Sequence, residues 1–483
     1  MIDALYKISP VFLKRSYINA FKAWQYIKYK MGIIRFQDTP ASSLPKETIK
    51  SYNKQRPYGY RQELCYAPFT SMFFSRAGYM SPCYATYGEK SDRWPDKSIR
   101  DSWFNGEFQN IRKHIGHYNL QYACKFCQPV FEFHNFGSLL SNKYESYGIN
   151  KQAYPKIMEF ELSNRCNLEC IMCDGNLSSA IRKNREKQPP LPDHYNQDFV
   201  EELKEFIPHL QMVEFTGGDP FLIPIYYDIW ELIHDMNPTC QILITTNANT
   251  MSKRIENMLN TYKNLHFNIS LDSLNKEHYE QIRRGADFDQ VIQNTKRLIA
   301  YCHENNTSCN LLVCPLTINS RDFQGLIEFA NAHDICVYFH TVVKPRELSL
   351  KYQSTSYLSN LIAYLKNYAP LKKSSKQRTN AENYESLINL LETWQHESIS
   401  PDHQKPMDAG EIISSLQKSL SKPAFDRLVN LLQYYQDTPG YNILLQKLHT
   451  ISKEDLKNAL DKEKTDKLHQ HIKGIMNLYP KQP

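Results

Sequence analysis

Residues 159–173 decide the fold: Glu-Phe-Glu-Leu-Ser-Asn-Arg-Cys-Asn-Leu-Glu-Cys-Ile-Met-Cys. They contain three cysteines in C-x3-C-x2-C spacing: Cys166, Cys170 and Cys173. The preceding residues 156–162 predict a buried strand. Three thiolates on one loop suit an iron–sulfur cube with one iron left open to a small chelating molecule. A zinc site would need a fourth Cys or His nearby, and residues 174–176 are Asp, Gly and Asn. Three buried core thiols are the plainer alternative, but core cysteines seldom take this loop spacing.

The cysteine loop resembles the signature of the radical S-adenosylmethionine (radical SAM) superfamily, and the resemblance covers about residues 155–344. It implies a [4Fe–4S] cluster whose open iron binds the methionine part of S-adenosylmethionine. An electron from this cluster breaks the C5′–S bond, and the 5′-deoxyadenosyl radical abstracts hydrogen from a substrate. The resemblance therefore implies an oxidoreductase or maturase-type enzyme with an electron donor such as ferredoxin or flavodoxin.

Length and composition indicate a multidomain protein without a membrane span. A chain of 483 residues is long enough for two to four domains. No apolar run is long enough to cross a bilayer. The twelve cysteines, in a long chain without an export signal, favour thiolates in a reducing cytoplasm over a disulfide framework. The net charge of +7 permits an acidic partner but does not indicate nucleic acid.

The first segment, residues 1–50, begins with a basic amphipathic stretch over residues 1–36. It lacks the apolar block and cleavage site of a secretory signal. The plain interpretation is a helix packed on the protein with a solvated basic face. A helix that lies on a membrane surface is the alternative, so peripheral membrane contact stays open.

The second segment, residues 51–150, carries four cysteines suited to one metal site: Cys65, Cys83, Cys124 and Cys127. Gly78, between two hydrophobic runs, predicts a hairpin turn, and residues 98–106 predict a helix. The segment resembles the auxiliary-cluster module called SPASM or, in its shorter form, twitch. Residues that match this pattern are Cys65, Pro68, Phe69, Gly78, Pro82, Cys83, Trp103, Cys124 and Cys127. The resemblance implies one auxiliary [4Fe–4S] cluster, although the module normally follows the core. A zinc ribbon is the alternative.

Residues 151–347 alternate between strand and helix patterns. Further strands are expected at residues 212–216, 241–246, 266–271, 310–314 and 335–342. Helices are expected at residues 198–207, 225–236, 252–261, 288–304 and 322–332. This alternation predicts an α/β fold with a parallel sheet. Six strand–helix units suit a partial (β/α)6 barrel, which the resemblance also implies.

The strand ends supply candidate cofactor contacts, because functional residues of such sheets lie at the carboxyl ends of strands. Residues 216–220, Thr-Gly-Gly-Asp-Pro, resemble the Gly-Gly-Glu-Pro motif that holds the methionine amine. Small polar groups at the next ends suit ribose hydroxyls. The predicted cofactor-binding residues are Gly217, Gly218, Asp219, Asn247, Ser270, Asp272 and Arg284. Asp219 stands where the family has Glu, and Arg284, in the position of an arginine that meets the cofactor carboxylate, has the alternative of a solvated helix end.

Residues 348–483 predict a helical extension of short amphipathic helices without a chemical constellation. The leading hypothesis is a radical SAM enzyme that modifies an unactivated C–H bond, with a peptide or protein as the first substrate class by analogy. A dehydrogenase or epimerase of a sugar or nucleotide is the alternative enzyme, and a non-catalytic iron–sulfur scaffold or a zinc-ribbon nucleic-acid protein is the alternative class. Cys314, at a strand end, is a candidate hydrogen-atom donor, with a buried core residue as the plainer interpretation.

Overall fold

The computed structural model describes residues 11–31, 33–34, 42–86, 88, 90–132, 134–147 and 154–399, and a few positions between 421 and 432. The chain divides into two compact units, Met1–Gln353 with Tyr357–Leu391 and Ser354–Ser356 with Glu392–Pro483. The sheet and the candidate site lie in the first unit. Among the described residues, no helix combines the length and apolar character that crossing a bilayer requires.

A single nine-stranded sheet organises the first unit, in the order β3-β2-β1-β4-β5-β6-β7-β8-β9. Strand β1 pairs with β4 in parallel, and each strand from β4 to β9 pairs in parallel with the next one. The β1–β2 and β2–β3 pairs are antiparallel. The strands are β1 Ser71–Ser75, β2 Tyr79–Ser81, β3 Asp92–Arg93, β4 Ile157–Glu161, β5 Met212–Phe215, β6 Gln241–Thr246, β7 Leu265–Ser270, β8 Cys309–Val313 and β9 Cys336–Phe339. Mixed α/β architecture is thereby confirmed, and β4–β9 match the six predicted strands.

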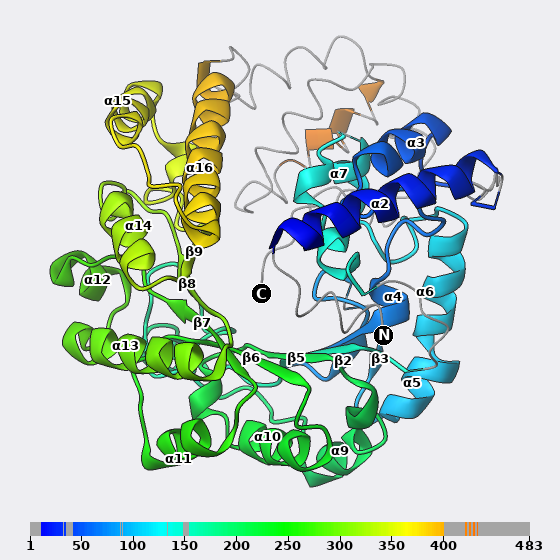
Figure 1. Ribbon diagram of the computed structural model, residues 1–483, viewed down its shortest axis with the longest axis horizontal. Coiled ribbons are helices and arrows are strands. Elements are labelled where there is room, and N and C mark those ends of the chain that lie inside the picture. Colours follow the sequence, from blue (N-terminus) through cyan, green and yellow to red (C-terminus); the bar gives the residue numbers. More distant parts are fainter. Residues whose placement is uncertain are drawn as a thin grey trace. The chain divides into compact units, whose positions relative to one another are not determined.

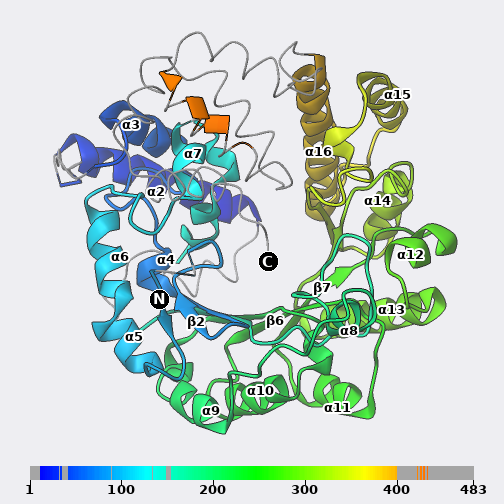
Figure 2. The same ribbon diagram turned by 180° about the vertical axis from the view of Figure 1, so that it is seen from behind.

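Helices connect the parallel strands. They are α8 Ser179–Asn184 and α9 Gln197–Leu203, then α10 Pro224–Met236, α11 Lys253–Thr261, α12 Lys276–Ile282, α13 Phe288–Asn305 and α14 Phe323–Ala332. Figures 1 and 2 show α9, α10, α11 and α13 along one face of the sheet. Side chains alternate along β5–β8 between fully buried and half-buried, so the buried face packs against this layer and the other face stays accessible. The short helices α8 and α12 were not predicted, because each is too short for a clear period.

The N-terminal part carries α2 Val11–Lys30, α3 Lys46–Gln55, α4 Ala67–Thr70, α5 Ile99–Asn105, α6 Glu107–Gly116 and α7 Cys127–Glu132. The predicted hairpin at Gly78 is β1–β2, and Gly78 has a φ of +84°. Short 3-10 turns follow at η1 Phe136–Ser138 and η2 Leu140–Tyr144. Further 3-10 turns in the core and beyond are η3 Ile207–His209, η4 Pro220–Leu222 and η5 Leu350–Tyr352.

The hairpin joins the same sheet as the predicted core, because β1 pairs with β4 in parallel. A ladder of aromatic rings explains the junction. Phe74 of β1 stacks on Phe160 of β4 at 5.2 Å between ring centroids, and Phe160 stacks on Phe215 of β5 at 5.0 Å. The register places each ring directly beside the next. Residues 51–150, expected to form a separate module, and residues 151–347, expected to form the core, thus contribute strands to one sheet.

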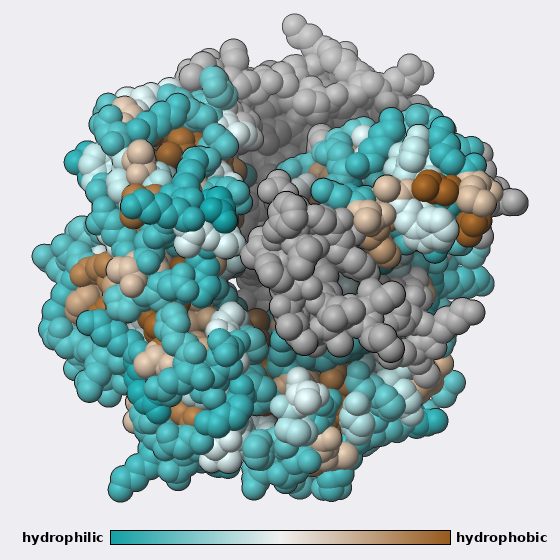
Figure 3. Space-filling model, in the orientation of Figure 1, coloured by the Kyte–Doolittle hydropathy of each residue, from teal (hydrophilic) through white to brown (hydrophobic). Residues whose placement is uncertain are grey.

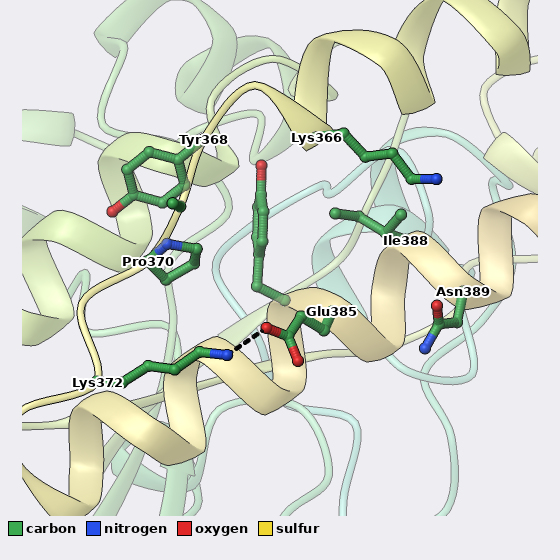
Figure 4. Close-up of a pocket in the computed structure, with 9 residues that line it drawn as sticks. Lys366, Tyr368, Pro370, Lys372, Glu385, Ile388 and Asn389 are labelled. Atoms are coloured by element: carbon green, nitrogen blue, oxygen red, sulfur yellow. Dashed lines mark hydrogen bonds and ion pairs between the residues drawn. The ribbon is translucent and has the colours of Figure 1, made fainter.

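The C-terminal part begins with α15 Thr355–Lys366 and α16 Ser375–Ile399, two helices in the range where a helical extension is expected. Near them lies a cavity of about 310 Å³, drawn in Figure 4. An ion pair between Lys372 and Glu385 lies at its edge, at 2.6 Å. None of the predicted site residues line this cavity. Most of the further helices expected beyond residue 399 lie outside the described residues.

Candidate functional site

The cysteine loop leaves the carboxyl end of β4 and is held at both ends by hydrogen bonds. The Ser179 hydroxyl accepts from the Cys166 backbone N–H at 3.1 Å, and the Ser178 hydroxyl donates to the Leu168 carbonyl at 2.6 Å. The backbone N–H of Glu169 donates to the Arg284 carbonyl at 2.8 Å, and that of Ile171 donates to the carbonyl of Ile282, the last residue of α12, at 2.9 Å. The loop conformation is therefore fixed by its neighbours as well as by its own sequence.

The three thiols lie half-buried or buried at this loop. The Cys173 thiol, which hydrogen-bonds to Cys170, and the Arg283 guanidinium lower the pKa of Cys170 despite its burial. The Arg283 guanidinium donates toward the Cys170 sulfur at 3.8 Å, and the Asn247 side-chain amide donates toward the Cys166 sulfur at 3.8 Å. Donors aimed at sulfur stabilise thiolates, the form that binds iron. The donor set thus fits a cluster held by three cysteines.

The Gly217–Gly218 turn after β5 lies directly against the cysteine loop. A Cβ at Gly218 would meet the Arg165 carbonyl oxygen at 2.1 Å, and a Cβ at Gly217 would meet the Ser163 carbonyl oxygen at 2.5 Å. Gly217 also has a φ of +116°, which disfavours any side chain. The Gly218 N–H donates to the Ser163 carbonyl at 3.0 Å. Both glycines are required because two backbones meet here.

Asp219 lies in the interior and has three donors from the protein itself. Its carboxylate accepts from the Thr246 hydroxyl and the Asn247 N–H, both at 2.8 Å, and from the Phe221 N–H at 3.0 Å. Burial raises the pKa of Asp219, and these donors oppose the rise. The carboxylate therefore ties the end of β5 to the end of β6. Its predicted contact with a methionine amine stays a prediction.

Asp272, after β7, is fully buried and pairs with Arg283. The Arg283 Nε lies 2.7 Å from Asp272 Oδ2, and the Cys314 N–H donates to Asp272 Oδ1 at 2.7 Å. The Asn319 amide donates to the carbonyls of Asp272 and Cys314 at 2.8 and 3.1 Å. Asp272 thus reaches the cysteine loop through Arg283, which also contacts Cys170. Ser270, the other predicted ribose residue, is half-buried on the accessible face of β7.

The two adjacent arginines take opposite orientations. The Arg284 side chain is exposed, and its backbone carbonyl accepts from the Glu169 N–H at 2.8 Å. Arg283 is the buried one, and sequence reasoning missed it. A signal was present in the chain: residues 276–282 form α12, and recognition of that helix would have placed Arg283 at its end beside the buried Ile282.

Cys314 follows β8 and is half-buried, in agreement with the period-two pattern of the strand. It packs with Ile171 and Met172 of the cysteine loop, around Ile282 and Leu316. Burial raises the pKa of its thiol to about 12, so the thiol stays protonated at neutral pH. The structure places this S–H beside the candidate cluster loop.

The four predicted auxiliary cysteines come together from three segments of the chain. Cys65 and Cys83 pack in one cluster with Tyr144 and Ile157, whereas Cys124 and Cys127 pack on the neighbouring cluster. Burial raises the pKa of Cys124 well above its usual range, and the other three thiols raise it further. The Ala67 N–H donates to the Cys65 sulfur at 3.4 Å. Cys65 thus shares one thiol-rich site with Cys124 and Cys127, which lie 59 and 62 positions further along the chain.

A polar network that the sequence did not reveal connects this region with the accessible face of the sheet. Lys143 donates to Glu159 of β4 and Glu214 of β5, both at 2.7 Å. Glu159 also accepts from the Tyr144 hydroxyl at 2.7 Å and the Ser71 hydroxyl at 3.0 Å. The partners lie 16 and 71 positions from Lys143, so no local pattern identifies them.

Within the described ranges, no three His, Cys, Asp or Glu side chains converge tightly enough to hold a single metal ion. Both groups of cysteines are included in those ranges. A cube holds its thiolates on separate irons and spaces them more widely than one zinc ion does. Sets of three and of four cysteines match the ligands that iron–sulfur clusters use.

Comparison with known proteins defines the class of the central domain. Residues 160–330 match the radical SAM superfamily, so the chain contains a radical SAM domain. It is 21% identical over 256 residues to a probable GTP 3′,8-cyclase of Methanocaldococcus jannaschii, covering 53% of this chain and 77% of that protein. It is 25% identical over 172 residues to a GTP 3′,8-cyclase of Clostridium botulinum, covering 35% and 48%. These relatives support an enzyme of the radical SAM type.

A solved structure gives a weaker likeness. SuiB of Streptococcus suis, bound to S-adenosylmethionine, is 18% identical with a TM-score of 0.34, and the match covers 53% of this chain and 61% of SuiB. The chain spans about half the length of several curated relatives that it matches.

Proposed function

We propose that this protein is a radical SAM enzyme that cleaves S-adenosylmethionine reductively and modifies an unactivated C–H bond of a peptide or protein. The observation that carries the proposal is the cysteine loop, with the Gly217–Gly218 turn packed against its backbone and Arg283 and Asn247 aimed at its sulfurs. Cys166, Cys170 and Cys173 would hold the cluster. When bound, the cluster and S-adenosylmethionine supply a 5′-deoxyadenosyl radical for hydrogen abstraction.

The residues around the loop have positioning roles in this proposal. Asp219 fixes the ends of β5 and β6 through its three internal donors. Asp272 orients Arg283, and Arg283 places positive charge beside Cys170. Ser270, on the accessible face, and the exposed Arg284 remain candidates for direct cofactor contacts.

We propose that Cys65, Cys83, Cys124 and Cys127 hold one auxiliary [4Fe–4S] cluster. Burial and the neighbouring thiols raise the pKa of Cys65 and of Cys124 well above the usual range, which supports this assignment, because thiolates become stable there only with a bound cation. The cluster would exchange electrons with the substrate radical or with the first cluster. A zinc site is the competing assignment.

A nucleotide substrate is the second candidate, because the curated relatives are named GTP 3′,8-cyclases. The accessible face of β4 and β5 weighs against a triphosphate. Glu159, Glu161 and Glu214 lie there, and their basic partners are Lys143 and Arg76. These three carboxylates and two cations give this part of the face no surplus of positive charge with which to bind a triphosphate.

The first experiment separates the two iron sites. Replacing Cys166, Cys170 and Cys173 together with Ala in anaerobically reconstituted protein is expected to remove about four irons per chain and to abolish release of 5′-deoxyadenosine. Cys240→Ala is the matched control, since Cys240 is fully buried just before the amino end of β6, at the opposite edge of the sheet from the cysteine loop. Unchanged iron content in the triple variant would contradict the assignment.

The iron that remains in the triple variant tests the auxiliary site. Iron with an equal amount of acid-labile sulfide supports a second iron–sulfur cluster, whereas one zinc per chain without iron supports a zinc ribbon. The substrate class is tested separately by incubating wild-type protein with GTP or with peptide libraries. Stimulation of 5′-deoxyadenosine release by GTP alone would refute a peptide substrate.

A further inference from the structure

Helix α2 is attached to the protein by one face, described from Ile18 onward. Tyr29 stacks on Tyr60 at 4.6 Å between ring centroids, and the Arg61 guanidinium lies 5.5 Å from the centre of the Phe21 ring. A Cβ at Gly59 would lie 3.1 Å from the Cα of Lys22, so the two backbones almost touch. Residues 21, 25 and 29 share this face at helical spacing and are half-buried.

The opposite face of α2 is apolar and exposed. We define the α2 patch as Trp24 and Ile27 of α2 together with Met31 and Ile33 just beyond its end at Lys30; they are 51%, 45%, 65% and 60% exposed. The first three lie three and four positions apart and therefore share a face. In Figure 3 brown and tan atoms gather near the end of α2, on the right of the view. Lone exposed apolar residues are ordinary, but several on one helix face indicate a contact surface.

Positive charge surrounds the α2 patch. The Lys28 ammonium lies 5.5 Å from the centre of the Trp24 ring, and the Lys30 ammonium lies 5.6 Å from that of Tyr26. Between Asp3 and Asp38 the sequence has no acidic residue. On the neighbouring α3, Glu47 is paired with Lys50 at 2.8 Å. The described surface of α2 thus presents apolar side chains flanked by lysines.

We propose that α2 docks this protein on an anionic membrane surface. An interfacial helix of this kind inserts Trp and aliphatic side chains below the headgroups while lysines contact lipid phosphates and carboxylates. Charge complementarity selects the lipid, because a stretch without acidic residues is attracted to a negative leaflet. The face of α2 that carries residues 21, 25 and 29 keeps its contacts with residues 58–61, so docking requires no rearrangement of the fold. The proposal is independent of the proposed chemistry.

Vesicle cosedimentation of the full-length protein tests this proposal. The protein is expected to bind phosphatidylcholine vesicles that contain phosphatidylserine, and to bind pure phosphatidylcholine at least about tenfold more weakly. Lys28→Glu with Lys30→Glu is expected to weaken binding to the anionic vesicles by about tenfold or more, since each basic residue adds about a factor of five.

A second variant, Trp24→Ser with Ile27→Ser and Met31→Ser, is expected to weaken binding by about a hundredfold. Leu371→Ser is the matched control, because Leu371 is also exposed and precedes two lysines. Thermal unfolding and iron content verify that each variant is folded. Equal binding to both vesicle types, binding that survives both variants, or self-association through the patch without vesicle binding would each overturn the proposal.

Discussion

Replacement of Gly218 by Ala tests how the glycine turn and the cysteine loop depend on each other. The added Cβ would lie 2.1 Å from the Arg165 carbonyl oxygen, 2.4 Å from its carbon and 2.7 Å from the Asn164 carbonyl carbon. All three contacts are with backbone atoms, so no side chain can rotate away. The loop must therefore shift by about 1 Å to restore ordinary contact distances.

The cost of this shift follows from the contacts that it breaks. Overpacking of a filled site costs about 1–3 kcal/mol. The hydrogen bonds from Gly218 N–H to the Ser163 carbonyl and from Asp219 N–H to the Arg165 carbonyl, 3.0 and 2.7 Å long, weaken as well, at about 0.5–1.5 kcal/mol each. We expect a loss of about 2–6 kcal/mol in the free energy of unfolding. Cys166, adjacent to Arg165, moves with the loop.

The assay combines denaturant unfolding of the apoprotein with iron analysis after anaerobic reconstitution. Gly218→Ala is expected to lose iron at the Cys166 loop and to retain iron at the auxiliary cysteines. Gly325→Ala is the control: in α14 a Cβ there meets only Leu274 Cδ1 at 4.0 Å, and Ala in a helix is expected to stabilise by about 0.5–1 kcal/mol. If Gly218→Ala keeps its full iron content and its unfolding free energy, the close approach of the two backbones does not constrain the loop.

Three further perturbations have defined outcomes. Arg56→Met removes the nearer of the two arginines paired with the fully buried Glu145, at 2.5 Å, and leaves only Arg61 at 3.8 Å, so the free energy of unfolding is expected to fall by about 3–5 kcal/mol in denaturant titrations; a loss below 1 kcal/mol would refute this. Cys314→Ala is expected to retain S-adenosylmethionine cleavage but to divert the substrate product, as mass spectrometry would detect; a normal product at a normal rate excludes a role for the thiol. Burial lowers the pKa of His266 to about 4, and its Nδ1 accepts from the Ser308 N–H at 3.0 Å. Since the unfolded state binds a proton near pH 6.5 and the folded state does not, stability is expected to fall as pH decreases from about 6.5 to about 4, and His266→Gln should flatten this dependence in thermal scans.

The sequence by itself determined the local architecture. Six parallel strands, most intervening helices and the hairpin at Gly78 follow from periodicity and turn residues, whose physical basis is local backbone geometry. The cysteine spacing and the Gly217–Gly218 turn were also readable, because a ligand loop and a tight backbone approach need particular residue types at fixed separations. Seven of the twelve cysteines fall into two groups for the same reason.

Only the tertiary structure decided which distant residues meet. The pairing of β1 with β4 depends on a ring ladder from Phe74 through Phe160 to Phe215, and no local pattern encodes it. The choice of Arg283 over Arg284 at the cysteine loop depends on the end of a short helix. Lys143 bridges two strands because the chain returns there, which sequence spacing cannot show. Such contacts form between elements that pack across the sheet. A buried charge without a partner costs free energy, so the fold in which each charge finds a partner is the stable one.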